Sequence, residues 1–223
     1  MTEQLTELAT EAYVVGFPLV FDLEQVVRFT QEGIGGVPAT PYNAFGHARR
    51  LAGPEDTFVS INNDTLYSIA QVDLGVGPIR LSVPEAGDRY YVLQFVDAWT
   101  NNFAYIGTRA TGGGAGEFLL LPPDAGDPDG RIPSIRFPTR VATIVGRWAV
   151  DGEDDLPAVH ALQDALGLTP VDETSPVPQG FPPSPPARMR PSTSSRSSAC
   201  GRRPSLPRNA TARRSTPTPR SGW

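Results

Sequence analysis

Two clusters of polar residues between Asn62 and Arg109 contain side-chain types that bind small ligands or carry out acid–base chemistry. The first is the run N-D-T-L-Y-S, which offers a carboxylate, two hydroxyls and a phenol. The second contains guanidinium groups, which suit bidentate binding of a carboxylate or a phosphate. The candidate binding residues are Asn63, Asp64, Thr65, Tyr67, Arg89, Asp97, Asn101, Tyr105 and Arg109. A pocket built from them would take a polar small molecule or a metal.

The first cluster also has a structural interpretation. Asn and Asp side chains bond readily to nearby backbone amides, so Asn62–Asp64 fits a sharp turn that enters a strand. Strand alternation then places Leu66 on one face, with Thr65 and Tyr67 on the other. The sequence alone leaves both the turn and the pocket open.

The second cluster allows two interpretations as well. Asp97 ends the apolar face of a strand predicted over Tyr90–Asp97, where an unpaired carboxylate is costly. Pairing with Arg89, Arg109 or Arg147 would relieve that cost, because buried charges are usually paired. The rival interpretation is that one of these arginines holds a ligand.

Signatures of well-known chemistry are missing. The run Gly112–Gly116 is followed by neither Lys-Ser/Thr nor a helix, so we predict a flexible hairpin loop and no phosphate site. The two histidines, His47 and His160, are not in any metal-ligand spacing, and no metal site is predicted. No serine stands in a G-x-S-x-G context. Whether the protein is an enzyme, and which cofactor it uses, the sequence leaves undecided.

The elements that must position these residues are a helical start and a β-rich middle. Apolar residues at intervals of three and four predict helix over residues 2–29, and Gly16-Phe17-Pro18 predicts a kink between two helical pieces. A second helix is predicted near 154–166, ended by Gly167. The predicted strands are Thr57–Ile61, Leu66–Leu74, Ile79–Val83, Tyr90–Asp97, Phe103–Gly107, Phe118–Leu121 and Val141–Val150.

No helix-length segment separates successive predicted strands, which favours antiparallel pairing. We therefore predict an α+β fold with a mainly antiparallel, β-sandwich-like core, a kinked N-terminal helix and a second helix near 154–166. The predicted globular domain covers residues 1–172, with its β-rich core at about 57–150.

Residues 173–223 have a different composition. Residues 1–179 carry 10 Arg and 24 acids, whereas residues 180–223 carry nine Arg and no acid. Pro, Ser and Arg without apolar periodicity predict a disordered basic tail. An acid-free tail on an acidic domain is also what a shifted reading frame produces, and back-translation permits an amphipathic helix in another frame. Both origins of the tail stay open.

Compartment and partners follow from composition. Cys200 is the single cysteine, so no internal disulfide forms. The acidic N-terminus lacks the basic region of a signal peptide, and apolar runs are too short to span a bilayer, so we expect a cytoplasmic protein. The body is acidic and the tail has no interleaved aromatic residues, so nucleic acid binding by the body is not expected. The oligomeric state is not predicted.

Several short motifs are spread along the chain: Glu11-Ala12-Tyr13, Gly16-Phe17-Pro18, Asn63–Ser68, Asp73-Leu74, Val83-Pro84, Arg89-Tyr90, Asp97, Gly107–Arg109, Gly146-Arg147 and Leu168–Pro170. Taken together, they resemble the domain-of-unknown-function 1254 family. The resemblance covers roughly residues 3–172, and it implies a second β-rich companion domain after this one and, in many members, export.

Two classes of function are consistent with the sequence. The chain is either half of a small-molecule-binding or hydrolase-like protein, with a pocket at the Asp64–Tyr67 edge and Arg89 or Arg109, or a non-catalytic β-sandwich module that serves assembly or is an inactive remnant.

Overall fold

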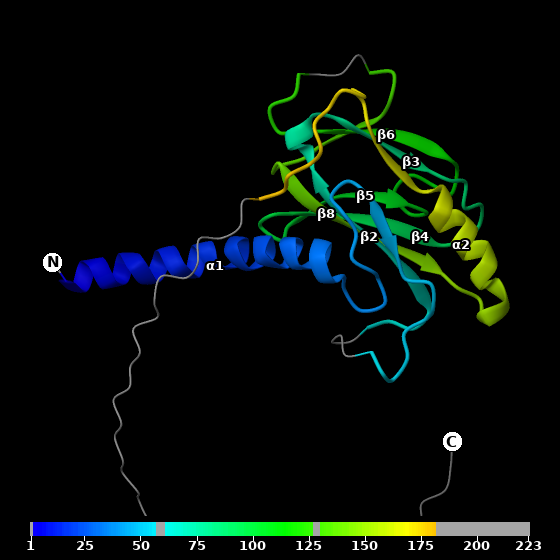
Figure 1. The fold of residues 1–223 in the computed structure, drawn as a ribbon, viewed down its shortest axis with the longest axis horizontal. Helices are drawn as coiled ribbons and strands as arrows, with labels where there is room; N and C mark the ends of the chain where they lie inside the picture. The colour runs from blue at the N-terminus through cyan, green and yellow to red at the C-terminus, as the bar shows by residue number, and fades with distance from the viewer. Residues whose placement is uncertain (1, 57–60, 127–129, 182–223) are drawn as a thin grey trace, which may run out of the picture. The chain divides into compact units, whose positions relative to one another are not determined.

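The computed structural model of the chain describes residues 2–56, 61–126 and 130–181. The described residues form two α-helices and nine strands, and Figure 1 shows their arrangement. In chain order they are α1 (Thr2–Glu32), β1 (Phe45–His47), β2 (Thr65–Asp73), β3 (Ile79–Val83), β4 (Tyr91–Asp97), β5 (Asn102–Gly107), β6 (Gly116–Leu121), β7 (Ser134–Arg136), β8 (Val141–Ala149), α2 (Leu156–Ala165) and β9 (Gly167–Pro170). The predicted α+β class is confirmed.

The strands form two sheets. The five-stranded sheet has the order β1-β2-β8-β4-β5 and is antiparallel throughout. The four-stranded sheet has the order β7-β6-β3-β9, and only β7 runs parallel to its neighbour. Strand β8 is the long central strand of the larger sheet, because it pairs along its length with both β2 and β4. The predicted antiparallel sandwich is confirmed.

The hydrophobic core consists of the inward-facing residues of both sheets. Strands β4 and β8 of the larger sheet alternate between buried and less buried residues, as expected of a sheet that is covered on one face. Strand β2 alternates from Leu66 to Ala70, and its last residues, 70–73, are all buried. Tyr91 and Trp148 stack at the centre, with their ring centroids 4.9 Å apart. The smaller sheet contributes Ile79, Leu81 and Leu120, which have no exposed surface.

The long segment between α1 and β2 is held by hydrogen bonds to the sheet. The Asn43 side chain pairs with both backbone groups of Asp73, at 3.0 Å to the carbonyl and 2.8 Å to the amide. This segment also forms β1, which the sequence did not predict. Edge strands β7 and β9 were missed too, and all three are only three or four residues long. Residues 57–60 of the strand predicted at Thr57–Ile61 lie outside the described residues.

The last described segment returns to the sandwich at Asp73. This carboxylate is 2% exposed and accepts hydrogen bonds from the backbone amides of Gly75, at 2.8 Å, and Gly180, at 2.9 Å. Arg140 lies 3.2 Å from the same carboxylate and donates to the carbonyl of Gly180. These contacts tie residues up to 180 to the domain. The remainder of the predicted tail, residues 182–223, lies outside the described residues.

Helix α1 is one continuous helix through Pro18, not two separate pieces. Only its C-terminal half packs on the sandwich, where Val26 is 2% exposed. Residues 3–15 are exposed on all sides, and in Figure 1 this half of the helix extends away from the sheets. No helix in the described part of the chain has the length and hydropathy that crossing a membrane requires.

Asp22, on the packed half of α1, is partly buried close to Asp97. Burial, and to a smaller extent the nearby Asp97 carboxylate, raise the pKa of Asp22 to about 6. The raised pKa means that the folded chain binds this proton more tightly than the unfolded chain does. The stabilisation that protonation of Asp22 gives to the folded state is therefore present at low pH. It is lost as the pH rises from about 4 to about 6.

We predict that Asp22→Asn raises the melting temperature at pH 7 and has little effect at pH 4. The expected gain at pH 7 is about 1–2 kcal/mol, after allowing for solvent screening of a half-buried group. Thermal denaturation at both pH values measures it. Glu24→Gln, which removes an exposed acid from the same helix, controls for net charge. An equal gain at both pH values would contradict the assignment.

Candidate functional site

The candidate site lies on the outer face of the five-stranded sheet. Alternation along β2 turns Thr65 and Tyr67 away from the core, and β8 turns Val145 and Arg147 the same way. The register pairs Tyr67 directly with Arg147. The Arg147 guanidinium accordingly lies over the Tyr67 ring, 5.4 Å from its centroid, which is the geometry of a cation–π contact.

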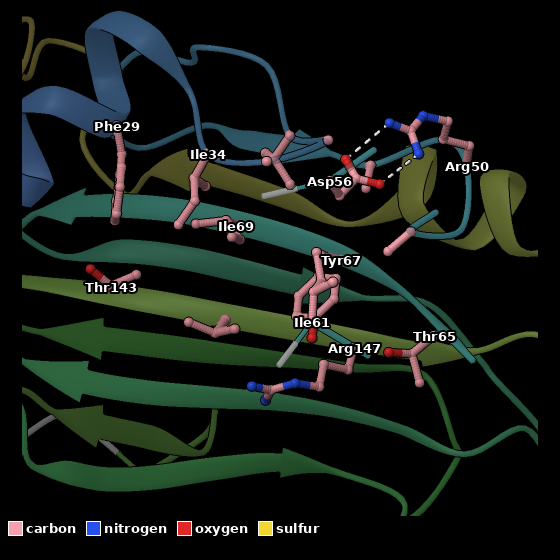
Figure 2. Close-up of a pocket in the computed structure, with 16 residues that line it drawn as sticks. Phe29, Ile34, Arg50, Asp56, Ile61, Thr65, Tyr67, Ile69, Thr143 and Arg147 are labelled. Atoms are coloured by element: carbon pink, nitrogen blue, oxygen red, sulfur yellow. Dashed lines mark hydrogen bonds and ion pairs between the residues drawn. The ribbon is translucent and has the colours of Figure 1, made fainter. Parts of the chain in front are cut away.

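A cavity of about 240 Å³ lies between this face, the stretch 29–56 and Ile61 (Figure 2). Its apolar walls come from both sides. They are formed by Phe29, Ile34, Gly35, Gly36, Val37, Ala48, Ala52, Ile61, Ile69 and Val145. The polar groups that line it are Arg50, Asp56, Thr65, Tyr67, Thr143 and Arg147.

The two arginines of the cavity differ in their charge balance. Arg50 forms two hydrogen bonds with the Asp56 carboxylate, at 2.8 and 3.0 Å, so its charge is neutralised. Arg147 donates one hydrogen bond to the neutral side chain of Gln94, at 3.0 Å. No carboxylate within residues 2–56, 61–126 or 130–181 forms a salt bridge with Arg147. Within the described part of the chain, Arg147 is therefore a cavity cation without an anionic partner.

A second polar group lies next to the cavity. The Gln71 side chain is 3% exposed, and its carbonyl oxygen accepts a hydrogen bond from Thr143 at 2.6 Å. Its Nε2 has no acceptor among the described residues. It borders a space of about 10 Å³, and Phe29 and Ile69 line this space as well as the large cavity. That volume suits a single water molecule, which would satisfy the amide.

The sequence-predicted residues fall into separate groups. Thr65 and Tyr67 line the cavity. Tyr105 and Arg109 line a neighbouring groove of about 330 Å³ across β4 and β5. Arg109 lies 5.4 Å from the Tyr90 ring centroid. The groove adjoins the cavity because Val92 pairs with Arg147 on one side and with Gly107 on the other.

Arg89 has a structural role. Its guanidinium binds the Asp155 carboxylate at 2.5 and 2.6 Å and donates to the carbonyl of Ala149 at 2.6 Å. Hydrogen bonding from Arg89 lowers the pKa of Asp155 to about 2. The pair links the start of β4 to the turn before α2. The oxygens that accept the hydrogen bonds of Arg89 belong to Asp155 and Ala149, so this guanidinium holds the fold together.

Asp97 and Asn101 shape the β4–β5 turn. The Asp97 carboxylate accepts hydrogen bonds from the backbone amides of Trp99 and Asn101, both at 2.9 Å, and from the Asn101 side chain at 3.2 Å. The expected arginine partner is not found among the described residues. Backbone amides take its place, because the tight turn, with Thr100 at φ 66°, directs them toward the carboxylate.

The N-N-D run forms the expected Asx turn. The Asn62 side-chain oxygen accepts from the amides of Asp64, at 3.1 Å, and Thr65, at 3.0 Å. Asn63 and Asp64 are exposed, and neither lines the cavity. The turn therefore positions Thr65 for the cavity, and the Asp64 carboxylate stays outside it.

A serine–histidine pair lies on the other face of β2. Ser68 is fully buried, and its hydroxyl lies 2.8 Å from His47 Nδ1 and 3.0 Å from Trp148 Nε1. Gln163 of α2 donates to the same hydroxyl at 3.3 Å. The indole and the amide can only donate to this oxygen, so the hydroxyl proton is directed to His47. The group ties α2 and β1 to the sheet, and a substrate has no access to Ser68.

Burial, and to a smaller extent the positive charge of Arg49, lower the pKa of His47 to about 4. The unfolded chain therefore binds this proton more tightly than the folded chain does between about pH 4 and the ordinary value of about 6.5. The contribution of His47 to the free energy of unfolding is fully present above that window, and it decreases as the pH falls through the window. The linkage has the opposite sign to that of Asp22.

We predict that His47→Asn reduces the acid sensitivity of the fold. The Asn amide oxygen can accept the Ser68 proton as Nδ1 does, and Asn does not titrate. Between pH 7 and pH 4.5, the wild-type chain should lose about 1–2 kcal/mol more unfolding free energy than the variant. Urea unfolding at several pH values measures the difference. Parallel pH profiles would show that His47 does not titrate in this window.

Comparison with known proteins identifies the family. The profile described as "Protein of unknown function (DUF1254)" matches residues 42–170, more than half of the chain. The chain belongs to this family. The match contains β1 to β9, and with them every residue that lines the cavity from Ala48 onward. Curated proteins give no match.

Solved structures similar to this DUF1254 protein include the VPA0106 protein from Vibrio parahaemolyticus. The TM-score is 0.64 at 21% identity, over 82% of this chain and 43% of that one, so the likeness is one of fold. An uncharacterised protein from Burkholderia cenocepacia also matches, with a TM-score of 0.37, 15% identity, and coverage of 62% of this chain and 38% of that chain. This chain thus matches less than half the length of each.

Proposed function

We propose that this DUF1254 protein binds a small molecule with an apolar body and one acidic group, held in the outer-face cavity with the acid at Arg147. The observation that carries the proposal is a guanidinium without an anionic partner in the described structure, placed in a cavity with apolar walls. Small-molecule sites commonly have this composition, in which a few polar groups orient a largely apolar ligand.

The volume of the cavity supports a ligand of modest size. At about 240 Å³ it exceeds the roughly 150 Å³ of an engineered cavity that accepts benzene. A ring or a short hydrocarbon chain would lie against Phe29, Ile34 and Ile69 at one end. The acidic group would lie at the other, where Figure 2 shows Thr65, Tyr67 and Arg147 together.

The chemistry of the polar end favours a carboxylate. A guanidinium presents paired N–H donors that match the two oxygens of a carboxylate, and such charge-assisted hydrogen bonds are stronger than neutral ones. The Tyr67 phenol adds a neutral donor beside it, whereas the Thr65 hydroxyl donates to the Asn62 side chain at 3.0 Å and contributes to the cavity wall. Arg50 does not compete for the ligand, because Asp56 already holds it.

This proposal revises the pocket expected from the sequence. Thr65 and Tyr67 keep their ligand-binding roles, Arg147 takes the role proposed for Arg89 or Arg109, and Asp64 has none. Tyr105 and Arg109 would contact only a ligand that extends across Val92. We propose binding without catalysis, since the cavity lining contains no nucleophile paired with a base among the described residues.

We predict that Arg147→Met abolishes the preference for acids. Benzoate and hexanoate should raise the melting temperature of the wild-type chain, and their neutral analogues benzamide and hexanol should do so less. In Arg147→Met, acid affinity should fall about ten- to a hundredfold, the effect of losing about 1.5–3 kcal/mol of charge-assisted hydrogen bonding. Thermal shift and calorimetric titration measure both effects.

Two further variants make the test specific. Arg80→Met removes an arginine on the other sheet that pairs with Glu117, and it should leave acid binding unchanged. Val145→Phe fills the cavity without a change in charge, and it should weaken acids and neutral analogues alike. Equal acid binding by the wild-type chain and Arg147→Met would overturn the proposal.

A further inference from the structure

The Arg147 guanidinium is held by two neighbouring side chains. It donates to the Gln94 side-chain oxygen at 3.0 Å, and it lies over the Tyr67 ring. An arginine side chain carries several N–H donors, and within the described part of the chain only this one has a side-chain acceptor. The remaining N–H groups of Arg147 are therefore available to a ligand.

The orientation of the Gln94 amide follows from its neighbours. A guanidinium can only donate, so the Gln94 oxygen faces Arg147 and its Nε2 faces the other way. That Nε2 donates to the side-chain oxygen of Asn102 at 2.6 Å. The hydrogen bonds thus run in one direction, from Arg147 through Gln94 to Asn102, and both side chains that follow the arginine are uncharged.

An irregularity in β5 brings Asn102 to this face of the sheet. The register between β4 and β5 shifts, so that Val96 pairs with Asn102 where regular pairing would place Phe103. The Phe103 ring packs against the core instead, with its centroid 5.1 Å from that of Phe137. Bulges of this kind commonly re-aim a side chain next to a functional site. Here the shift leaves Asn102 within reach of Gln94.

We propose that Gln94 is the positioning residue for acid binding, because it fixes the Arg147 guanidinium with a neutral acceptor and leaves the positive charge to the ligand. This role rests on the function proposed for the cavity, and it adds the residue that sets the preference for acids over neutral molecules. A carboxylate at this position would compete with the ligand for the charge, as Asp56 does at Arg50 in the same cavity.

The sheet itself does not need this bridge. Strands β4 and β8 pair through their backbones from Tyr91 to Asp97, so a side-chain contact between them adds little to their register. What the contact changes is the freedom of the Arg147 side chain. A group that is already held when the ligand arrives loses less conformational entropy on binding, and its donors are already in place.

Titration of acids and their neutral analogues tests the role. Gln94→Glu keeps the acceptor and adds a charge, so it should lower the affinity for benzoate and hexanoate at least about tenfold. Benzamide and hexanol should bind within about twofold of their wild-type affinity. Gln94→Met removes the acceptor without a charge, and it should weaken the acids only about two- to tenfold. Gln4→Glu makes the same change of charge at an exposed position of α1, and it should bind acids as the wild-type chain does.

A double-mutant cycle without any ligand tests the contact. Melting temperatures are measured for the wild-type chain, Gln94→Glu, Arg147→Met and the double variant. An ion pair between Glu at position 94 and Arg147 should make the change Gln94→Glu about 1–4 °C more favourable in the presence of Arg147 than in its absence. Additive melting temperatures would show that the two side chains do not interact, and would overturn the role of Gln94.

The remaining outcomes separate the role of Gln94 from the function of the cavity. Acid binding that Arg147→Met abolishes and Gln94→Glu retains would overturn the role of Gln94 alone. An equal loss of acids and neutral analogues in Gln94→Glu would do the same, because it would show a change in the shape of the cavity. Coupling in the cycle without any acid binding by the wild-type chain would overturn the proposed function, and the role of Gln94 with it.

Discussion

The central strand β8 is the constraint on which the rest of the structure depends. It is hydrogen-bonded on both sides, so its register with β2 and β4 cannot shift without breaking both pairings. Trp148 is fully buried in the core, stacked on Tyr91 and bonded to Ser68. Because alternate residues of a strand face opposite ways, the burial of Trp148 forces Arg147 onto the outer face. The position of the candidate site thus follows from the packing of the core.

Most of the polar groups that suggested chemistry are used to hold the fold. Arg89 closes the turn before α2, Asp97 organises the β4–β5 turn, and Asp73 receives the returning C-terminal segment. Each lies where a buried charge without partners would be costly, and each has several partners. This distribution leaves Arg147 as the cavity cation that no carboxylate of the described structure neutralises. That difference separates the proposed binding group from the arginines that hold the fold.

The two halves of helix α1 differ in their contacts. The second half packs on the sandwich at Val26, and its last turn contributes Phe29 to the wall of the cavity. The first half carries apolar side chains that the described chain leaves exposed. Only the second half of the helix therefore takes part in the candidate site.

The sequence by itself determined the family, the α+β class and most strands, because local alternation and turn residues carry that information. The Asn62 turn and the range Ile79–Val83 were correct for this reason. The edge strands were missed because a three-residue strand has almost no period and forms only when a neighbour pairs with it. Arg147 shows the same limit. Strand alternation predicts that it lies on the face opposite to Trp148, but the sequence does not show whether an acid pairs with it. Only the tertiary structure decided which charges are neutralised, because the partners of Arg89, Asp97 and Arg147 come from distant segments or from backbone amides that a turn brings into place.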